Sequence, residues 1–67
     1  MALYIIKELD RNGVPFRDDD TTEYFDDSDY NGNGYAAAED RYNRLVAQTD
    51  AAFPGTGKDR WMVLKVG

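Results

Sequence analysis

The most distinctive chemistry in this sequence is a run of acidic side chains between residues 18 and 29 that no basic residue interrupts. Alternate residues of an extended strand lie ~6.5–7 Å apart, at about 3.3 Å per residue, which is close to the spacing of successive phosphates along one DNA strand. Carboxylates spaced in this way could occupy the Lys/Arg groove of a nucleic-acid-binding protein. The carboxylates are those of Asp18, Asp19, Asp20, Glu23, Asp26, Asp27 and Asp29.

Aromatic residues are interleaved with these carboxylates. Tyr24 and Tyr30 are of the type enriched at protein interfaces, and we expect them to act as anchors for a partner. Like charges so close together repel one another, which destabilises a fold unless a partner benefits from them. The alternative interpretation is a solvated, solubilising loop, which is the usual role of a charge run.

The charge balance narrows the classes of partner. Thirteen acidic against eight basic residues give a formal net charge of −5. Because an acidic surface repels nucleic acid and anionic membranes, we expect neither direct nucleic-acid binding nor membrane binding. The complementary partner is a basic protein surface, such as that of a nucleic-acid-binding complex.

A second pattern begins inside the acidic run and resembles a calcium loop. Asp27, Asp29 and Asn31 fall at positions one, three and five, and Gly32 at position six, of a helix-loop-helix calcium site. Position twelve, which needs a bidentate Glu, is Ala38, and the nearest acid, Glu39, is one residue late. Because one residue on a helix is about 100° of rotation, Glu39 would point away from the ion. The pattern therefore predicts a polar turn with positive φ before a helix, with a calcium site as the alternative.

Catalysis has little support in the residue types. The 67 residues include no Cys and no His, so disulfides, thiolate metal sites and the commonest general base are excluded. The segment 55–58, Gly-Thr-Gly-Lys, lacks the earlier Gly and the following Ser or Thr of a phosphate loop, because Ala52 and Asp59 stand there. We expect a protein that is not an enzyme and needs no cofactor.

The first part of the chain predicts a small sheet. Residues 3–9 are rich in aromatic and β-branched types with apolar groups on both faces, which is typical of a central strand. The pair Asn12-Gly13 predicts a hairpin turn, with a short return strand over residues 14–17 placed at an edge by Pro15. Residues 18–34 predict a polar connection with one helical turn over 21–25, pinned to the core by Tyr24 and Phe25.

The second part predicts the main helix over residues 35–53. Apolar residues recur there at three- and four-residue spacing, while Asp40 and Arg44 form an i,i+4 pair on the exposed side. Pro54 and Gly55 end the helix, residues 55–60 form a loop, and residues 61–66 form a last strand. The predicted buried stripe consists of Tyr35, Ala38, Tyr42, Leu45, Val46, Thr49 and Phe53.

Together these elements predict one α+β domain over residues 1–67: a small antiparallel sheet of two to three strands with one main helix packed on one face. A chain of this length cannot divide its apolar residues between two cores. The longest apolar stretches are far shorter than the ~20 residues that span a bilayer, and the N-terminus has no signal-peptide pattern. We therefore expect a cytoplasmic protein that stays in the cell that makes it.

In its small size, acidity and lack of Cys and His, the chain resembles the phage anti-CRISPR proteins that act as DNA mimics. Residues 4–8, Tyr-Ile-Ile-Lys-Glu, are similar to the first strand of some of these proteins, and the carboxylates of residues 18–29 resemble the phosphate-imitating surface of others. The resemblance implies a phage-type inhibitor that binds the nucleic-acid groove of a CRISPR effector complex and blocks target DNA binding. The alternatives are a small calcium-binding module and an acidic structural or assembly partner.

Overall fold

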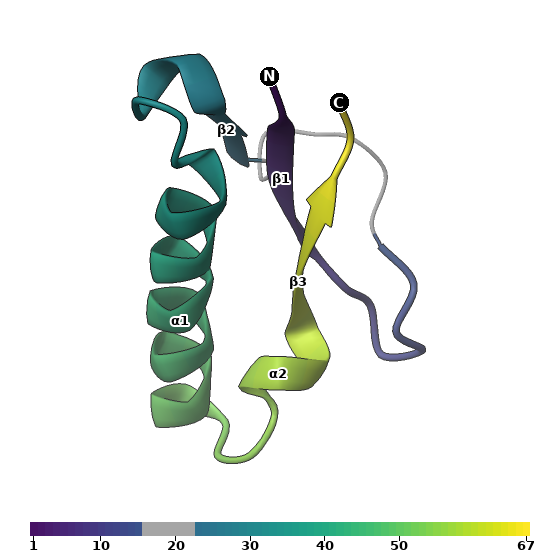
Figure 1. Cartoon of the computed structure of the whole chain (residues 1–67). Helices are drawn as coiled ribbons and strands as arrows, with labels where there is room; N and C mark the ends of the chain where they lie inside the picture. The colour runs from purple at the N-terminus through teal and green to yellow at the C-terminus, as the bar shows by residue number, and fades with distance from the viewer. Residues whose placement is uncertain (16–22) are drawn as a thin grey trace.

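The computed structural model covers the chain and describes residues 1–15 and 23–67. Strand β1 (Leu3–Glu8) is followed by strand β2 (Glu23–Asp26) and a single 3-10 turn, η1 (Asp27–Asp29). The long helix α1 (Gly34–Ala52), the short helix α2 (Gly57–Arg60) and strand β3 (Trp61–Lys65) complete the order. Figure 1 shows α1 on one side of the strands, with both termini at the end where α1 begins.

The three strands form one antiparallel sheet in the order β2-β1-β3. The predictions of an α+β fold and of a central first strand are therefore confirmed. Ile6 pairs with Glu23 on one side and with Val63 on the other, and Tyr4 pairs with Phe25. Cross-strand partners share a face of the sheet, so Tyr4, Ile6, Phe25 and Val63 all point toward the same side.

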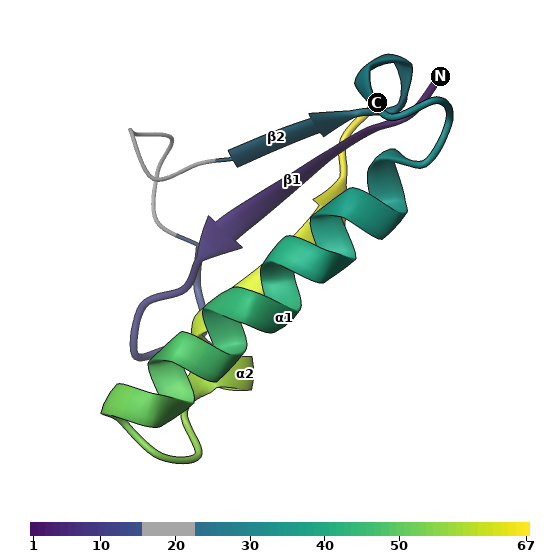
Figure 2. The ribbon, with the colours of Figure 1, turned by 90° about the vertical axis from the view of Figure 1, so that its left-hand side faces the viewer.

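That side of the sheet packs against α1 and forms the core. Ile6 is 1% exposed and Ala38 is fully buried, and Phe25 and Leu45 are buried with them. Half-buried aromatic and aliphatic side chains surround this cluster, namely Tyr4, Ala37, Tyr42, Trp61 and Val63. In Figure 2, α1 runs along the sheet as a single cover. The hydrophobic cluster therefore lies between α1 and one face of the sheet, while Ile5 and Lys7, on the other face, are each only 8% exposed.

The predicted helical stripe is right in its middle and wrong at its ends. Ala38 and Leu45 are buried, but Tyr35 is 52% and Phe53 59% exposed. The reason is geometric, because 19 residues of α-helix span about 28 Å whereas a six-residue strand spans about 20 Å. The C-terminal end of α1 therefore extends beyond the sheet, where Phe53 lies under the Arg60 guanidinium, while Tyr35 in the first turn packs edge-on against Tyr4 and remains half exposed.

Two predicted local structures are wrong. Residues 23–25, expected in a helical turn, belong instead to β2, because pairing with β1 satisfies their backbone and buries Phe25. Tyr24, expected to point inward, is 59% exposed because alternate residues of a strand face opposite sides. Residues 57–60, expected in a loop, form α2 instead.

The turn at Asn12-Gly13 forms, but by a different mechanism. Gly13 has a φ of 77°, and the Asp10 carboxylate accepts hydrogen bonds from the backbone N–H groups of Asn12 and Val14. In the described part of the expected return strand, Pro15 makes an isolated bridge with Leu9. Phe16 and Arg17 lie outside the described residues.

The segment between α1 and β3 turns tightly because Gly57 approaches α1. Its N–H donates to the Asp50 carboxylate at 2.7 Å, and a Cβ at this position would lie 2.5 Å from the Val46 carbonyl oxygen. Only glycine fits this contact, and it brings β3 back along α1. In residues 1–15 and 23–67, no helix has the length and apolar character needed to cross a membrane.

The central position of Leu45 in the core gives a direct test of the fold. We expect Leu45→Ala to lower the free energy of unfolding by roughly 2–5 kcal/mol, because it leaves a cavity in a small core. Gln48→Ala, on the exposed side of α1, is the matched control and should change it by less than about 0.5 kcal/mol. Urea denaturation followed by circular dichroism measures both, and equal midpoints for Leu45→Ala and the parent would show that the core is misassigned.

Candidate functional site: the β2–η1 acidic edge

The structure places the described part of the acidic run on an edge strand and the turn that follows it. Glu23 and Asp26 belong to β2, and Asp27 and Asp29 belong to η1. Asp18, Asp19 and Asp20 lie outside the described residues. We call residues 23–30 the acidic edge, since they contain these four carboxylates, Tyr24, Tyr30 and no basic residue.

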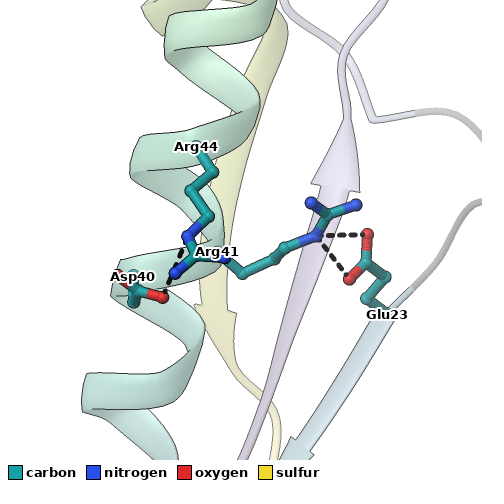
Figure 3. Close-up of polar contacts among 4 residues, drawn as sticks. All are labelled: Glu23, Asp40, Arg41 and Arg44. Atoms are coloured by element: carbon teal, nitrogen blue, oxygen red, sulfur yellow. Dashed lines mark hydrogen bonds and ion pairs between the residues drawn. The ribbon is translucent and has the colours of Figure 1, made fainter.

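Glu23 forms an ion pair across the sheet. The Nε of Arg41 donates to both carboxylate oxygens of Glu23, at 3.0 and 3.2 Å. Figure 3 shows the Arg41 side chain extending from α1 over β1 to β2, while Arg44 bonds to Asp40 on the helix itself. The Glu23 contact raises the pKa of Arg41 above its usual value, first through the hydrogen bond and then through charge. Glu23 is therefore paired with a base of its own chain.

The sequence alone does not single out Arg41 as the partner of Glu23. The available signal is its position, since Arg41 lies three residues after Ala38 and four before Leu45 and so borders the buried stripe. A base at that border can reach over the edge of a small sheet. Both side chains are more than a third exposed, so the pair contributes only about 0.2–1 kcal/mol.

Asp27 has a structural role at the centre of the acidic edge. One carboxylate oxygen accepts the N–H of Ala2 at 3.0 Å, and the other accepts the N–H of Gly34 at 2.8 Å. Its own backbone N–H donates to the carbonyl of Ala2, and its carbonyl accepts from Tyr30 and Gly32. Asp27 thus ties the start of β1, the end of β2 and the first residue of α1 together.

Gly34 is required at this junction. A Cβ at residue 34 would lie 2.6 Å from the Asp27 carboxylate and 3.1 Å from the Phe25 carbonyl oxygen. The buried glycine therefore allows α1 to begin directly against the end of β2. Asn31 and Gly32, with φ values of 55° and 88°, turn the chain between η1 and α1, which confirms the predicted polar turn.

Asp26 caps the 3-10 turn. Its carboxylate accepts hydrogen bonds from the Ser28 N–H and the Ser28 hydroxyl, both at 2.9 Å. These bonds, the backbone one foremost, lower the pKa of Asp26 below its usual value. Although Asp26 is engaged locally, it stays negatively charged at neutral pH and below.

The remaining groups of the acidic edge face solvent. Asp29 is exposed at the end of η1, and Tyr30 is 41% exposed while its ring packs 6.0 Å from that of Phe25. Tyr24 is 59% exposed on the face of the sheet that points away from α1. The described part of the acidic edge therefore carries a free carboxylate at Asp29 and two accessible tyrosines, Tyr30 beside Phe25 on the α1 side of the sheet and Tyr24 on the opposite face.

Hydrogen bonds within the chain compete with the alternative of a calcium site. The Asp27 oxygens, which would be the first ligands of the loop, already accept backbone hydrogen bonds. Within residues 1–15 and 23–67, no three His, Cys, Asp or Glu side chains gather in a way that could hold a metal ion. The loop geometry is thus stabilised by protein donors.

A hollow of about 650 Å³ lies at the opposite end of the molecule, between the turn after β1 and α2. Asp10 and Arg60 line it, but Asp10 is bonded to the turn and Arg60 pairs with Glu8 at 3.2 Å. These charged groups stabilise local structure, and their arrangement suggests no acid–base pair.

The comparisons with known proteins give no family. No protein-family model matches the chain, and neither a curated protein nor a solved structure matches it significantly.

The role of Asp27 predicts an asymmetry between neighbouring carboxylates. Asp27→Ala leaves the N–H groups of Ala2 and Gly34 without their acceptor, so we expect a loss of roughly 1–3 kcal/mol in the free energy of unfolding. Asp29→Ala, two residues later and exposed, should change it by less than about 0.5 kcal/mol. Chemical denaturation of the two variants decides this, and equal effects would contradict the structural role of Asp27.

Calcium binding can be tested separately. We expect no site tighter than about millimolar, the weak end of the range for such loops, because Asp27 is occupied and Ala38 stands at position twelve. Isothermal titration calorimetry with CaCl₂ measures the affinity. A micromolar site that disappears in Asp29→Ala, a variant expected to keep its fold, would support the calcium module instead.

Proposed function

We propose that this chain is a binding protein that inserts its acidic edge into the basic nucleic-acid groove of a protein complex and so blocks DNA binding. The observation that carries the proposal is the acidic edge itself, in which exposed tyrosines stand beside carboxylates without an interrupting base. A CRISPR effector complex is the partner suggested by the resemblance of the sequence to DNA-mimicking anti-CRISPR proteins. Under this proposal the chain performs no catalysis and works in the cytoplasm of the host cell.

Under this proposal the carboxylates of the acidic edge have two roles, one structural and one in binding. Asp27 holds the turn in shape, and Glu23 holds β2 to α1 through Arg41. Asp26 and Asp29 are then displayed on a fixed backbone, and the lowered pKa of Asp26 favours its charged form. A preorganised charged surface loses less conformational entropy on binding than a mobile one, which supports tight association.

The two tyrosines are proposed to supply binding affinity that exposed charges do not. Exposed ion pairs contribute little affinity in water, whereas tyrosine is enriched among the residues that dominate interface energies. Tyr24 is held on a paired strand, and Tyr30 rests on the ring of Phe25. Both side chains are therefore positioned before a partner arrives, and the carboxylates steer the encounter.

Charge reversal at Asp29 tests the proposal without disturbing the fold. We expect Asp29→Lys to weaken partner binding by about fivefold or more at low salt, equivalent to ~1 kcal/mol. Asp59→Lys makes the same change of charge on α2, at the other end of the molecule in Figure 1, and should have a much smaller effect. Surface plasmon resonance on a purified effector complex, at low and at physiological salt, measures both.

The salt dependence provides the second criterion. Exposed charges are screened beyond about 8 Å at physiological ionic strength, so the parent should associate more slowly as salt rises, and Asp29→Lys should show a weaker dependence. Equal affinities for the two reversals, or binding that salt leaves unchanged, would contradict the proposed role of the acidic edge.

A further inference from the structure

The sheet has a free edge at β3, on the side away from the acidic edge. In the described sheet, β3 pairs with β1 on one side and with no strand on the other. The N–H of Leu9 donates to the carbonyl of Arg60, and the N–H of Val66 donates to that of Leu3. Because an antiparallel ladder alternates, the even-numbered residues of β3 face β1. The backbone groups of Val63 and Lys65, and the carbonyl of Trp61, therefore point toward the free edge.

A groove runs beside this edge, between α1 and β3. It is a hollow of about 540 Å³ with aromatic walls formed by Tyr35, Tyr42 and Trp61. Trp61 is fixed there because its indole N–H donates to the Thr49 hydroxyl at 2.8 Å. An unpaired strand edge next to an apolar groove is the arrangement that accepts an added strand.

The acidic and basic residues of the groove lining lie toward opposite ends. Glu39 lies in the first part of α1, and Lys58 lies in α2, before the start of β3. Figure 1 shows that α1 and β3 run in opposite directions, so these residues lie toward opposite ends of the groove. Glu39 lines the groove beside Tyr35 and raises the pKa of that tyrosine, first through hydrogen bonding and then through charge. A groove that is acidic at one end and basic at the other is complementary to itself after a half-turn.

We propose that a second copy of this chain occupies the groove, and that the two copies pair through antiparallel β3 strands about a two-fold axis at Val63. In this register the N–H of Val63 donates to the carbonyl of Val63 in the second copy. The N–H of Lys65 donates to the carbonyl of Trp61 in the second copy, and symmetry repeats both bonds. Lys65 then lies opposite an aromatic residue, with no like charge directly across from it.

The spacing along the groove fits this arrangement. From Trp61 to Lys65 the strand rises about 13 Å, and from Thr49 back to Glu39 the helix rises about 15 Å. Because Thr49 contacts Trp61, Glu39 stands roughly level with Lys65. The two-fold axis places Trp61 of the second copy at that level and its α2 just beyond, so that Glu39 of each copy faces Lys58 of the other.

The interface combines an edge with a groove, and it needs both. A stable interface buries about 1,200–2,000 Å² in total, or about 600–1,000 Å² per partner. The pairing of two five-residue strands alone buries less than this. Filling both grooves adds the faces of Tyr35, Tyr42 and Trp61, and the two α1 helices come to lie on the same face of one six-stranded sheet.

Sedimentation equilibrium of the purified chain tests the pairing. We expect a concentration-dependent mass that rises from one chain to two, with a dissociation constant in the range of about 1–100 µM. A chain that stays monomeric up to about 1 mM overturns the proposal and leaves the groove to another partner.

Charge reversals at Glu39 and Lys58 test the proposed dimer more specifically. Glu39→Lys and Lys58→Glu should each raise the dissociation constant about tenfold or more, since each places like charges across the two-fold axis. An equimolar mixture of the two variants should recover part of the lost affinity, because in a mixed dimer both contacts between residues 39 and 58 join opposite charges. The double variant Glu39→Lys/Lys58→Glu should recover nearly all of it. Asp40→Lys, with the same charge change just outside the groove wall, is the control and should leave association nearly unchanged. Failure of the double variant to recover would contradict the proposed pairing.

The strand pairing itself is tested by Lys65→Pro. Its N–H points away from β1, so proline removes a donor to the second copy and none from the sheet. We expect a variant with the parent's circular dichroism spectrum and with dimerisation reduced about tenfold or more. An unchanged dissociation constant would exclude this edge as the interface.

Discussion

The arrangement of this small protein depends on one carboxylate at the junction of three elements. Asp27 accepts hydrogen bonds from the N–H groups of Ala2 and Gly34, and so joins the beginning of β1 to the beginning of α1 at the point where β2 ends. Without this carboxylate the two N–H groups would have no acceptor within the chain, and α1 would have no fixed start. Since α1 is the helix that covers the core, its direction over the sheet follows from this corner and from the contact of Gly57 with Val46 at the other end.

This constraint changes the meaning of the acidic run. Charge density alone suggests a surface in which every carboxylate imitates a phosphate, but three of the described four, Glu23, Asp26 and Asp27, have partners within the chain. The proposed binding function rests on the charges of Asp26 and Asp29 and on Tyr24 and Tyr30, which the pairing of β2 and the ring of Phe25 hold in place. If two copies pair through β3, their β2 strands become the outer strands of a six-stranded sheet, about 24 Å apart at ~4.8 Å per strand. Both acidic edges then remain open to a partner.

The sequence predicted the elements whose signal is periodic and local. The middle of α1, the central position of β1 and the turn at Asn31-Gly32 follow from apolar spacing and from residues that tolerate positive φ. It did not predict β2, because four residues with two acids carry little strand propensity and become a strand only by pairing with β1. The ion pair of Arg41 with Glu23 and the roles of Gly34 and Gly57 are also tertiary, since each depends on how closely α1 approaches another segment. The free edge of β3 became visible only with the strand order.

The central claim is that the acidic edge takes the place of nucleic acid on its partner. The most direct measurement is a competition titration, in which this chain is added to a guide-loaded CRISPR effector complex holding a fluorescent target duplex, and fluorescence anisotropy reports the bound DNA. The account predicts that the chain releases or excludes the duplex in proportion to its occupancy of the complex, and that added DNA raises its apparent dissociation constant by the same linkage. A ternary complex that holds both the chain and the duplex at undiminished affinity would contradict it.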